Sequence, residues 1–127
     1  MSGPKGDMVP TDADKRMLHD LLDELAGYVT NMYVPAYEER MRFLFPQIRA
    51  LGQGNPLVQD LLDSAEEYMQ HAVSFYHRRT DLGVQAGEGE ANRDPELLEL
   101  ARAKTQATRR WSDLWQQYRQ AHPTDKW

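Results

Sequence analysis

The sequence predicts an all-α protein whose helices form an antiparallel four-helix bundle. Apolar residues recur at helical spacing in four segments, and no segment keeps the strict alternation of a strand. Asn-Pro and Asp-Pro pairs, which are typical helix starts, precede two of these segments. Leucine occurs 14 times, against six valines and one isoleucine, and this preference favours helix over sheet. The expected helices span about residues 12–33, 35–51, 56–80 and 95–121.

The segment 56–80 carries the clearest pattern. Asn55 is suited to cap a helix, and Pro56 to occupy its first position, where the missing N–H is not needed. At 100° per residue the apolar side chains fall within an arc of roughly 160°. They are Leu57, Val58, Leu61, Leu62, Ala65, Tyr68, Met69, Ala72, Val73, Phe75 and Tyr76. Because one neighbour cannot cover so wide an arc, we expect this helix to pack against at least two others.

The first helix is expected to begin at Thr11 or Asp12, with acidic residues in its first turn, where the helix dipole favours them. Its apolar stripe is Met17, Leu18, Leu21, Leu22, Leu25, Tyr28, Val29 and Met32. Pro35 then interrupts the pattern, and a proline either kinks a helix or opens a new one. Residues 12–51 could therefore form one kinked helix or two helices, and the second arrangement gives the more compact bundle.

The segment 35–51 repeats apolar residues with a heptad rhythm that continues through Pro46. These residues are Val34, Tyr37, Met41, Leu44, Ile48 and Leu51. The rhythm predicts a continuous helix that is kinked near residues 42–46. Gly52 and Gly54 are expected to end it.

A mobile loop is predicted over residues 81–93, because three glycines and no apolar periodicity follow Arg78 and Arg79, which suit a helix C-terminus. Asp94 and Pro95 then begin the last helix. Its stripe is Leu97, Leu100, Ala103, Ala107, Trp111, Leu114, Trp115 and Tyr118, interrupted only by Lys104. Residues 11–121 are thus expected to form one domain between a flexible arm, residues 1–10, and a frayed tail, residues 122–127.

Composition indicates a thin hydrophobic core. Leu, Ile, Val and Phe together make up 24 of the 127 residues, close to the level below which chains do not fold alone. We therefore expect a protein partner, and above all a homodimer. The formal net charge is −5 and there is no cysteine, which excludes disulfides, thiolate metal sites and a cysteine nucleophile. No stretch resembles a signal peptide or a membrane span, so we expect a cytoplasmic protein without membrane contact.

Catalytic and metal-binding patterns are weak. Four-helix bundles often hold a di-iron site through Glu-x-x-His pairs, but the nearest approach here is Glu67 with His71, four residues apart and just outside the apolar arc. The glycines of residues 83–89 lack the Gly-Lys-Ser/Thr ending of a phosphate-binding loop. We therefore expect no catalytic residue, metal ligand or cofactor, and a protein that is not an enzyme.

The last helix offers an alternative function, because basic and aromatic residues alternate along it. Its basic residues are Arg102, Lys104, Arg109, Arg110 and Arg119, among Trp111, Trp115 and Tyr118. Such side chains could hold a nucleic-acid backbone and stack on bases. The aromatic residues share the stripe that should face the bundle, however, and the acidic net charge opposes binding to phosphates.

Two residues depart from the bundle pattern. Phe43 falls on the outer side of its helix, where it could anchor a partner with Arg40 and Arg42 close by. Lys104 places a charge within an apolar stripe, where it either snorkels past the indoles or forms a paired site at an interface. The sequence therefore predicts a helical interaction protein: an adaptor, chaperone-like partner, inhibitor or assembly subunit. Its candidate partner-binding residues are Phe43, Arg40, Arg42, Lys104, Arg102, Arg109 and Arg110. The alternatives are a nucleic-acid-associated subunit and a ligand- or metal-binding bundle.

Overall fold

The computed structural model describes residues 11–31, 33–86 and 93–122, and these residues form an all-α bundle. Its helices are α1 (Asp12–Thr30), α2 (Pro35–Leu51), α3 (Pro56–Ala86) and α5 (Pro95–Ala121). The predicted fold class is thus confirmed. The predicted N-terminal arm, the tail from residue 123 onward and the predicted loop over residues 87–92 lie outside the described residues.

The helix starts follow the capping residues that the sequence contains. The Thr11 hydroxyl accepts a hydrogen bond from the Asp14 backbone N–H, and the Asp14 carboxylate accepts one from the Thr11 N–H. The Asn55 side chain accepts from the first free N–H groups of α3, and Asp94 does the same for α5 through the N–H of Leu97. Each cap satisfies backbone donors that would otherwise lack partners at a helix N-terminus.

Residues 12–51 form two helices and not one kinked helix. The first ends at Thr30, three residues before its expected end, and both Asn31 and Val34 have extended backbone angles. Pro35 then occupies the first turn of α2, where its fixed φ angle suits a helix start. As the heptad rhythm predicts, α2 continues without a break through Pro46.

The prediction of a loop from residue 81 is wrong for residues 81–86, which belong to α3. Gly83 weakens the helix without ending it, since a glycine in a helix costs only about 1 kcal/mol relative to alanine. Arg78, which suited a helix C-terminus, instead points across to α5 and forms ion pairs with Asp94 and Glu96. These cross-helix contacts help to keep the last turns of α3 against α5.

The core is one cluster of buried residues to which all four helices contribute. Its fully buried large apolar and aromatic side chains are Leu22, Leu25, Val29, Met41, Leu44, Ile48, Val58, Leu61, Leu62, Trp111 and Tyr118. Gly52 allows α2 and α3 to approach closely, because a Cβ atom there would lie 2.3 Å from Val58 Cγ1. Within the described residues, no helix is long and apolar enough to cross a membrane.

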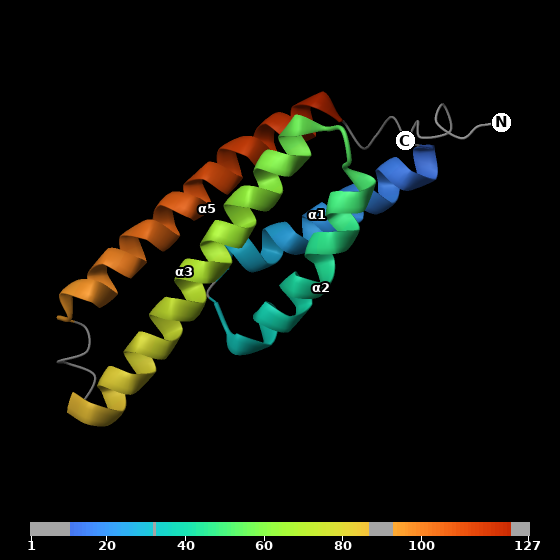
Figure 1. Cartoon of the computed structure of the whole chain (residues 1–127). Coiled ribbons are helices and arrows are strands. Elements are labelled where there is room, and N and C mark those ends of the chain that lie inside the picture. The colour runs from blue at the N-terminus through green and yellow to red at the C-terminus, as the bar shows by residue number, and fades with distance from the viewer. Residues whose placement is uncertain (1–10, 32, 87–92, 123–127) are drawn as a thin grey trace.

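The long helices α3 and α5 form the largest interface and extend beyond the two short helices (Figure 1). Two contacts mark where the cover of α1 and α2 ends. The Tyr33 ring packs edge-on against Tyr76, with centroids 6.0 Å apart, and the Thr108 hydroxyl donates to the Val29 carbonyl oxygen at 3.2 Å. We call the part beyond them, residues 76–86 and 95–107, the arm. At 1.5 Å per residue it is roughly 15–20 Å long.

Candidate protein-binding surface

Phe43 lies on the surface of α2, as the sequence predicts, with 55% of its area exposed. The Arg40 guanidinium lies over its ring, 4.9 Å from the centroid. Arg40 also forms an ion pair with Glu24 of α1, and Arg42 pairs with Glu38 one turn earlier in α2. Both arginines beside Phe43 therefore already have carboxylate partners within the chain.

The Arg40 pair also affects a neighbouring tyrosine. Glu24 accepts a hydrogen bond from the Tyr28 hydroxyl as well as from Arg40. The Arg40 hydrogen bond lowers the pKa of the Glu24 carboxyl, and the bond to Glu24 raises the pKa of Tyr28. The group joins α1 to α2 and is best understood as a structural contact of the bundle.

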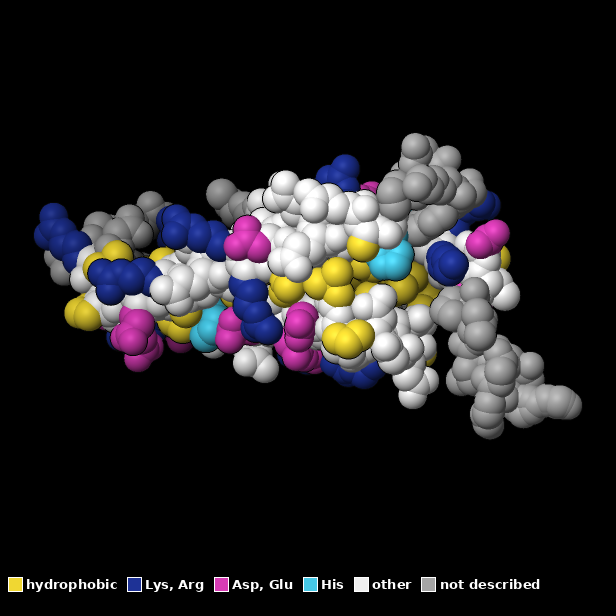
Figure 2. Space-filling view, turned by 90° about the horizontal axis from the view of Figure 1, so that it is seen from above, with side chains coloured by type: hydrophobic (Ala, Val, Ile, Leu, Met, Phe, Trp, Pro, Cys, Tyr) yellow, Lys and Arg dark blue, Asp and Glu magenta, His cyan; other side chains and the backbone are white. Residues whose placement is uncertain are grey.

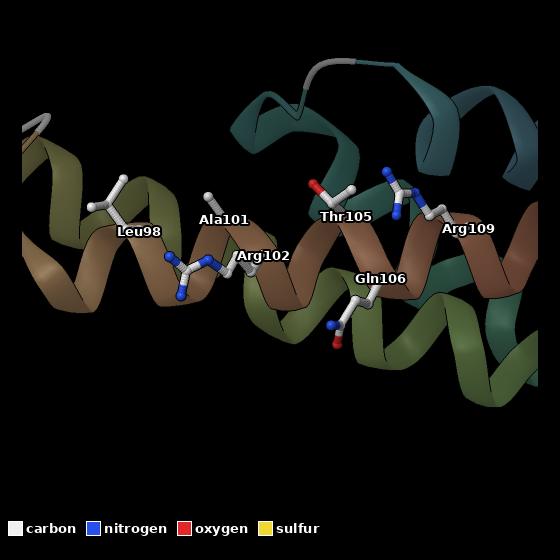
Figure 3. Close-up of a pocket in the computed structure, with 6 residues that line it drawn as sticks. All are labelled: Leu98, Ala101, Arg102, Thr105, Gln106 and Arg109. Carbon is white, nitrogen blue, oxygen red and sulfur yellow. The ribbon is translucent and has the colours of Figure 1, made fainter.

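The predicted basic residues of α5 do not form a single cluster. Arg102 and Arg109 line a shallow hollow of about 360 Å³ together with Leu98, Ala101, Thr105 and Gln106 (Figure 3). All six residues belong to α5, and Leu98, Ala101 and Thr105 point to the side of the helix on which α1 and α2 lie. Arg110 is exposed and is not among the residues that line the hollow. The hollow is an open surface rather than an enclosed cavity.

Lys104 is half-buried on α5 and faces α3. Its ammonium is 4.4 Å from the centroid of the Phe75 ring of α3, at cation–π distance. Burial lowers the pKa of Lys104, and the nearby positive charge of Arg79 lowers it further. The exposed Arg79 thus adds positive charge to the surroundings of the partly buried Lys104 ammonium.

Arg79 and its neighbour Arg78 have different surroundings. Arg78 pairs with Asp94 at 2.9 Å and with Glu96 at 3.3 Å, and the Arg78 bond holds the pKa of the Asp94 carboxyl below its usual range. Among the residues that the structure describes, neither Arg79 nor Lys104 has an ion pair with a carboxylate. The arm therefore contains two neighbouring cations without an acidic partner.

Apolar side chains accompany these cations. Tyr76 is 39% exposed and Leu98 is 47% exposed, and both are among the few large apolar residues that the described chain leaves at its surface. Val34, also exposed, adjoins Tyr33, whose ring contacts Tyr76. Figure 2 shows Lys and Arg side chains beside apolar ones over the arm, at the left of the view.

The aromatic residues of α5 are used inside the bundle. Trp111 and Tyr118 are buried. Trp115 lies between them, stacking on both rings and on His19 of α1 at centroid distances of 5.7–5.9 Å. Trp111, Trp115 and Tyr118 therefore serve as core residues, and they do not form an exposed platform on which bases could stack.

Metal ligands are not gathered in the described part of the chain, where no group of three or more His, Asp or Glu side chains could hold a metal ion. Glu67 is exposed, and His71, one turn further along α3, is half-buried. The pair has no third ligand beside it among the described residues.

Sequence reasoning missed Arg79, Tyr76 and Leu98 as candidate site residues. The sequence predicts Arg79 at a helix end and Tyr76 within the apolar arc of its helix, and it gives Leu98 no role. Had residues 81–86 been predicted as helix, the third and fourth predicted helices would have been expected to extend beyond the two short ones.

Comparison with known proteins gives no further guidance: no family model, curated protein or solved structure matches this chain.

Proposed function

We propose that this protein is a non-enzymatic helical interaction protein that binds another protein through the arm. The observation that carries the proposal is the extension of α3 and α5 beyond α1 and α2. In the body of the bundle four helices cover one another, whereas among the described residues the two amphipathic helices of the arm pack mainly on each other. Exposed apolar residues at such a place are typical of a surface that another protein covers.

Two features support the arm over the Phe43 surface. Tyr76, Leu98 and Ala101 offer apolar area on two helices, whereas Phe43 is a single ring on one helix. Among the described residues, Arg79 and Lys104 of the arm have no carboxylate partner, whereas Arg40 and Arg42 have one each. A partner that covers the arm would therefore gain both apolar contacts and new ion pairs.

Site-specific photo-crosslinking tests the proposal. A photoreactive phenylalanine analogue replaces Leu98 of the arm in one variant and Gln117, an exposed residue nearer the other end of α5, in a control variant. We expect a discrete protein adduct in cells from Leu98 and not from Gln117, reduced by Tyr76→Glu. Mass spectrometry then identifies the adduct. The proposal fails if Leu98 gives no adduct, or the same adducts as Gln117.

Self-association is distinguished in the same experiment. The chain has a mass of 14.7 kDa, so an adduct of two copies has about twice that mass and contains only peptides of this sequence. Light scattering of the purified chain, at low and high salt, shows whether such an adduct reflects the expected homodimer.

A further inference from the structure

We propose that the segment which docks on the arm is an amphipathic α-helix of a second protein, with an acidic side chain placed between Arg79 and Lys104. The inference rests on the proposed function and specifies the chemistry of the partner. It follows from the shape of the arm, from its unpaired cations and from the identity of the residues around them.

The shape of the arm suits a helix. Two antiparallel helices leave a groove along each side of their contact, and a third helix can place its own side chains in such a groove. Leu98, Ala101 and Thr105 succeed one another along α5 at spacings of three and four, and Tyr76 lies on α3 beside the end of the α1–α2 pair. An arm of roughly 15–20 Å accommodates three to four turns of a docked helix.

The cations define the charge of that helix. Lys104 is partly buried and lies over the Phe75 ring, so its charge has lost water without gaining a carboxylate. Arg79 adds a second positive charge near it. A carboxylate between the two would relieve their repulsion and would form its ion pair in a partly desolvated site, where such pairs contribute most to specificity.

Arg79 and Lys104 form no ion pair with the acidic residues of the arm, Asp81, Glu96 and Glu99, or with the adjoining cap residue Asp94, in the described part of the chain. Asp94 accepts two hydrogen bonds from Arg78 and one from the Leu97 N–H, and Glu96 pairs with the same arginine. These acidic groups are thus already engaged by Arg78. A partner helix can supply the carboxylate that Arg79 and Lys104 lack.

A second copy is a poorer occupant than a foreign helix. In a two-fold dimer of arms whose axis passes near Arg79 and Lys104, these residues of one copy would approach the same cations of the other. Like charges across an interface oppose association. Exposed Leu98 and Tyr76, together with the net charge of −5, likewise favour a protein helix over the phosphates of a nucleic acid.

Two fluorescein-labelled peptides of about 18 residues test the inference by fluorescence anisotropy. Both carry leucines at helical spacings of three and four; one has glutamates beside the leucine stripe and the other has lysines. We expect the wild-type protein to bind the glutamate peptide about ten-fold more tightly. Because the protein carries a net charge of −5, its overall charge would favour the lysine peptide, and a preference for glutamate therefore reports the local cations.

Charge-reversal variants locate the site. Arg79→Glu and Lys104→Glu should each weaken binding of the glutamate peptide about ten-fold, and they should strengthen binding of the lysine peptide. Arg110→Glu makes the same charge change at an exposed position of α5 outside the hollow and should change either affinity less than about two-fold. Arg79 is exposed, so its variant remains informative if Lys104→Glu does not fold.

The outcomes separate the inference from the function on which it rests. Equal binding of the two peptides, with loss of both on Tyr76→Glu, overturns the acidic preference and leaves an arm that binds proteins. Binding of neither peptide overturns the helical occupant, and the crosslinking at Leu98 then decides the function by itself. The proposal of an acidic partner helix is also overturned if the protein forms a dimer that Arg79→Glu dissociates, or if a short RNA binds through Arg79 and Lys104.

Discussion

The close approach of α2 and α3 at Gly52 can be tested by a pair of glycine-to-alanine substitutions with opposite expected effects. At Gly52 an added Cβ would lie 2.3 Å from Val58 Cγ1, 2.9 Å from Val58 Cβ and 3.1 Å from the Ile48 carbonyl oxygen. Ordinary contacts begin near 3.4 Å, so the two helices or the Val58 side chain must move by about 1 Å. Valine has one strongly preferred rotamer in a helix, and Val58 is fully buried. Overpacking of this kind costs roughly 1–3 kcal/mol, and we expect Gly52→Ala to lose that much unfolding free energy.

The matched control is Gly27→Ala in α1. An added Cβ at Gly27 meets nothing within 4 Å, and the residue is helical. Alanine restricts the unfolded chain and favours helix, so we expect a gain of roughly 0.5–1 kcal/mol. Gly54→Ala separates strain from clash, because Gly54 has a φ of 84° with nothing within 4 Å. That left-handed conformation should cost alanine about 1 kcal/mol.

Urea unfolding followed by far-UV circular dichroism measures all three variants, with equal m-values as the condition for comparing them. The order of stability should be Gly27→Ala, wild type, Gly54→Ala, Gly52→Ala. A Gly52→Ala variant as stable as wild type would show that α2 and α3 do not approach as closely as described. A destabilised Gly27→Ala variant would contradict the open surroundings of α1 at that residue.

Three further predictions concern polar groups. The pKa of Asp94 is lowered in the folded protein, so the ionised Asp94 stabilises the fold fully above its unfolded-state pKa, near 4. This stabilisation is lost as the pH falls through the folded-state pKa. Asp94→Asn keeps the helix cap, so it should reduce the change in urea midpoint between pH 2 and about pH 5. Burial raises the pKa of Tyr68 to about 12, so the ultraviolet titration of Tyr68→Phe should lack the tyrosine that ionises last. The variant also loses the 3.3 Å hydrogen bond to the Asn31 carbonyl oxygen, which should lower the free energy of unfolding by roughly 0.5–1.5 kcal/mol. Lys104→Met keeps contact with the Phe75 ring without a charge, so the variant should be at least as stable as wild type in urea at pH 7. It should also lose the preference for the glutamate peptide. A large loss of stability would show that the lysine serves the fold instead.

The body of the bundle could be predicted from the sequence because its signals are local. The cap-and-proline pairs place the starts of α3 and α5 where the structure has them, and Pro35 starts α2. The burial of Trp111 and the exposure of Phe43 follow from their angles on single helices. Each of these depends on residues within one or two turns, which a sequence displays directly.

The end of α3 could not be predicted because its contacts are distant in sequence. Arg78 and Arg79 read alike as cations at a helix C-terminus, yet Arg78 pairs with Asp94, 16 residues later, and Arg79 has no carboxylate partner in the described part of the chain. The surroundings of Lys104 likewise depend on how α3 and α5 are aligned, since Phe75 lies on the opposite helix. Periodicity shows that Lys104 interrupts an apolar stripe, but only the packing of α3 on α5 shows what it meets.

The position of Lys104 also links stability to function. A lysine within an apolar stripe lowers stability unless its charge finds water or a partner, and here it finds an aromatic ring and a second cation. A hydrophobic residue in its place would improve the packing of the arm but would leave no charge to distinguish an acidic helix from any other amphipathic helix. The cost of the lysine is confined to the arm, beyond the core that α1 and α2 cover. On the proposed function, the arm can therefore keep a charge that selects its partner, because Lys104 lies outside the buried core cluster to which all four helices contribute.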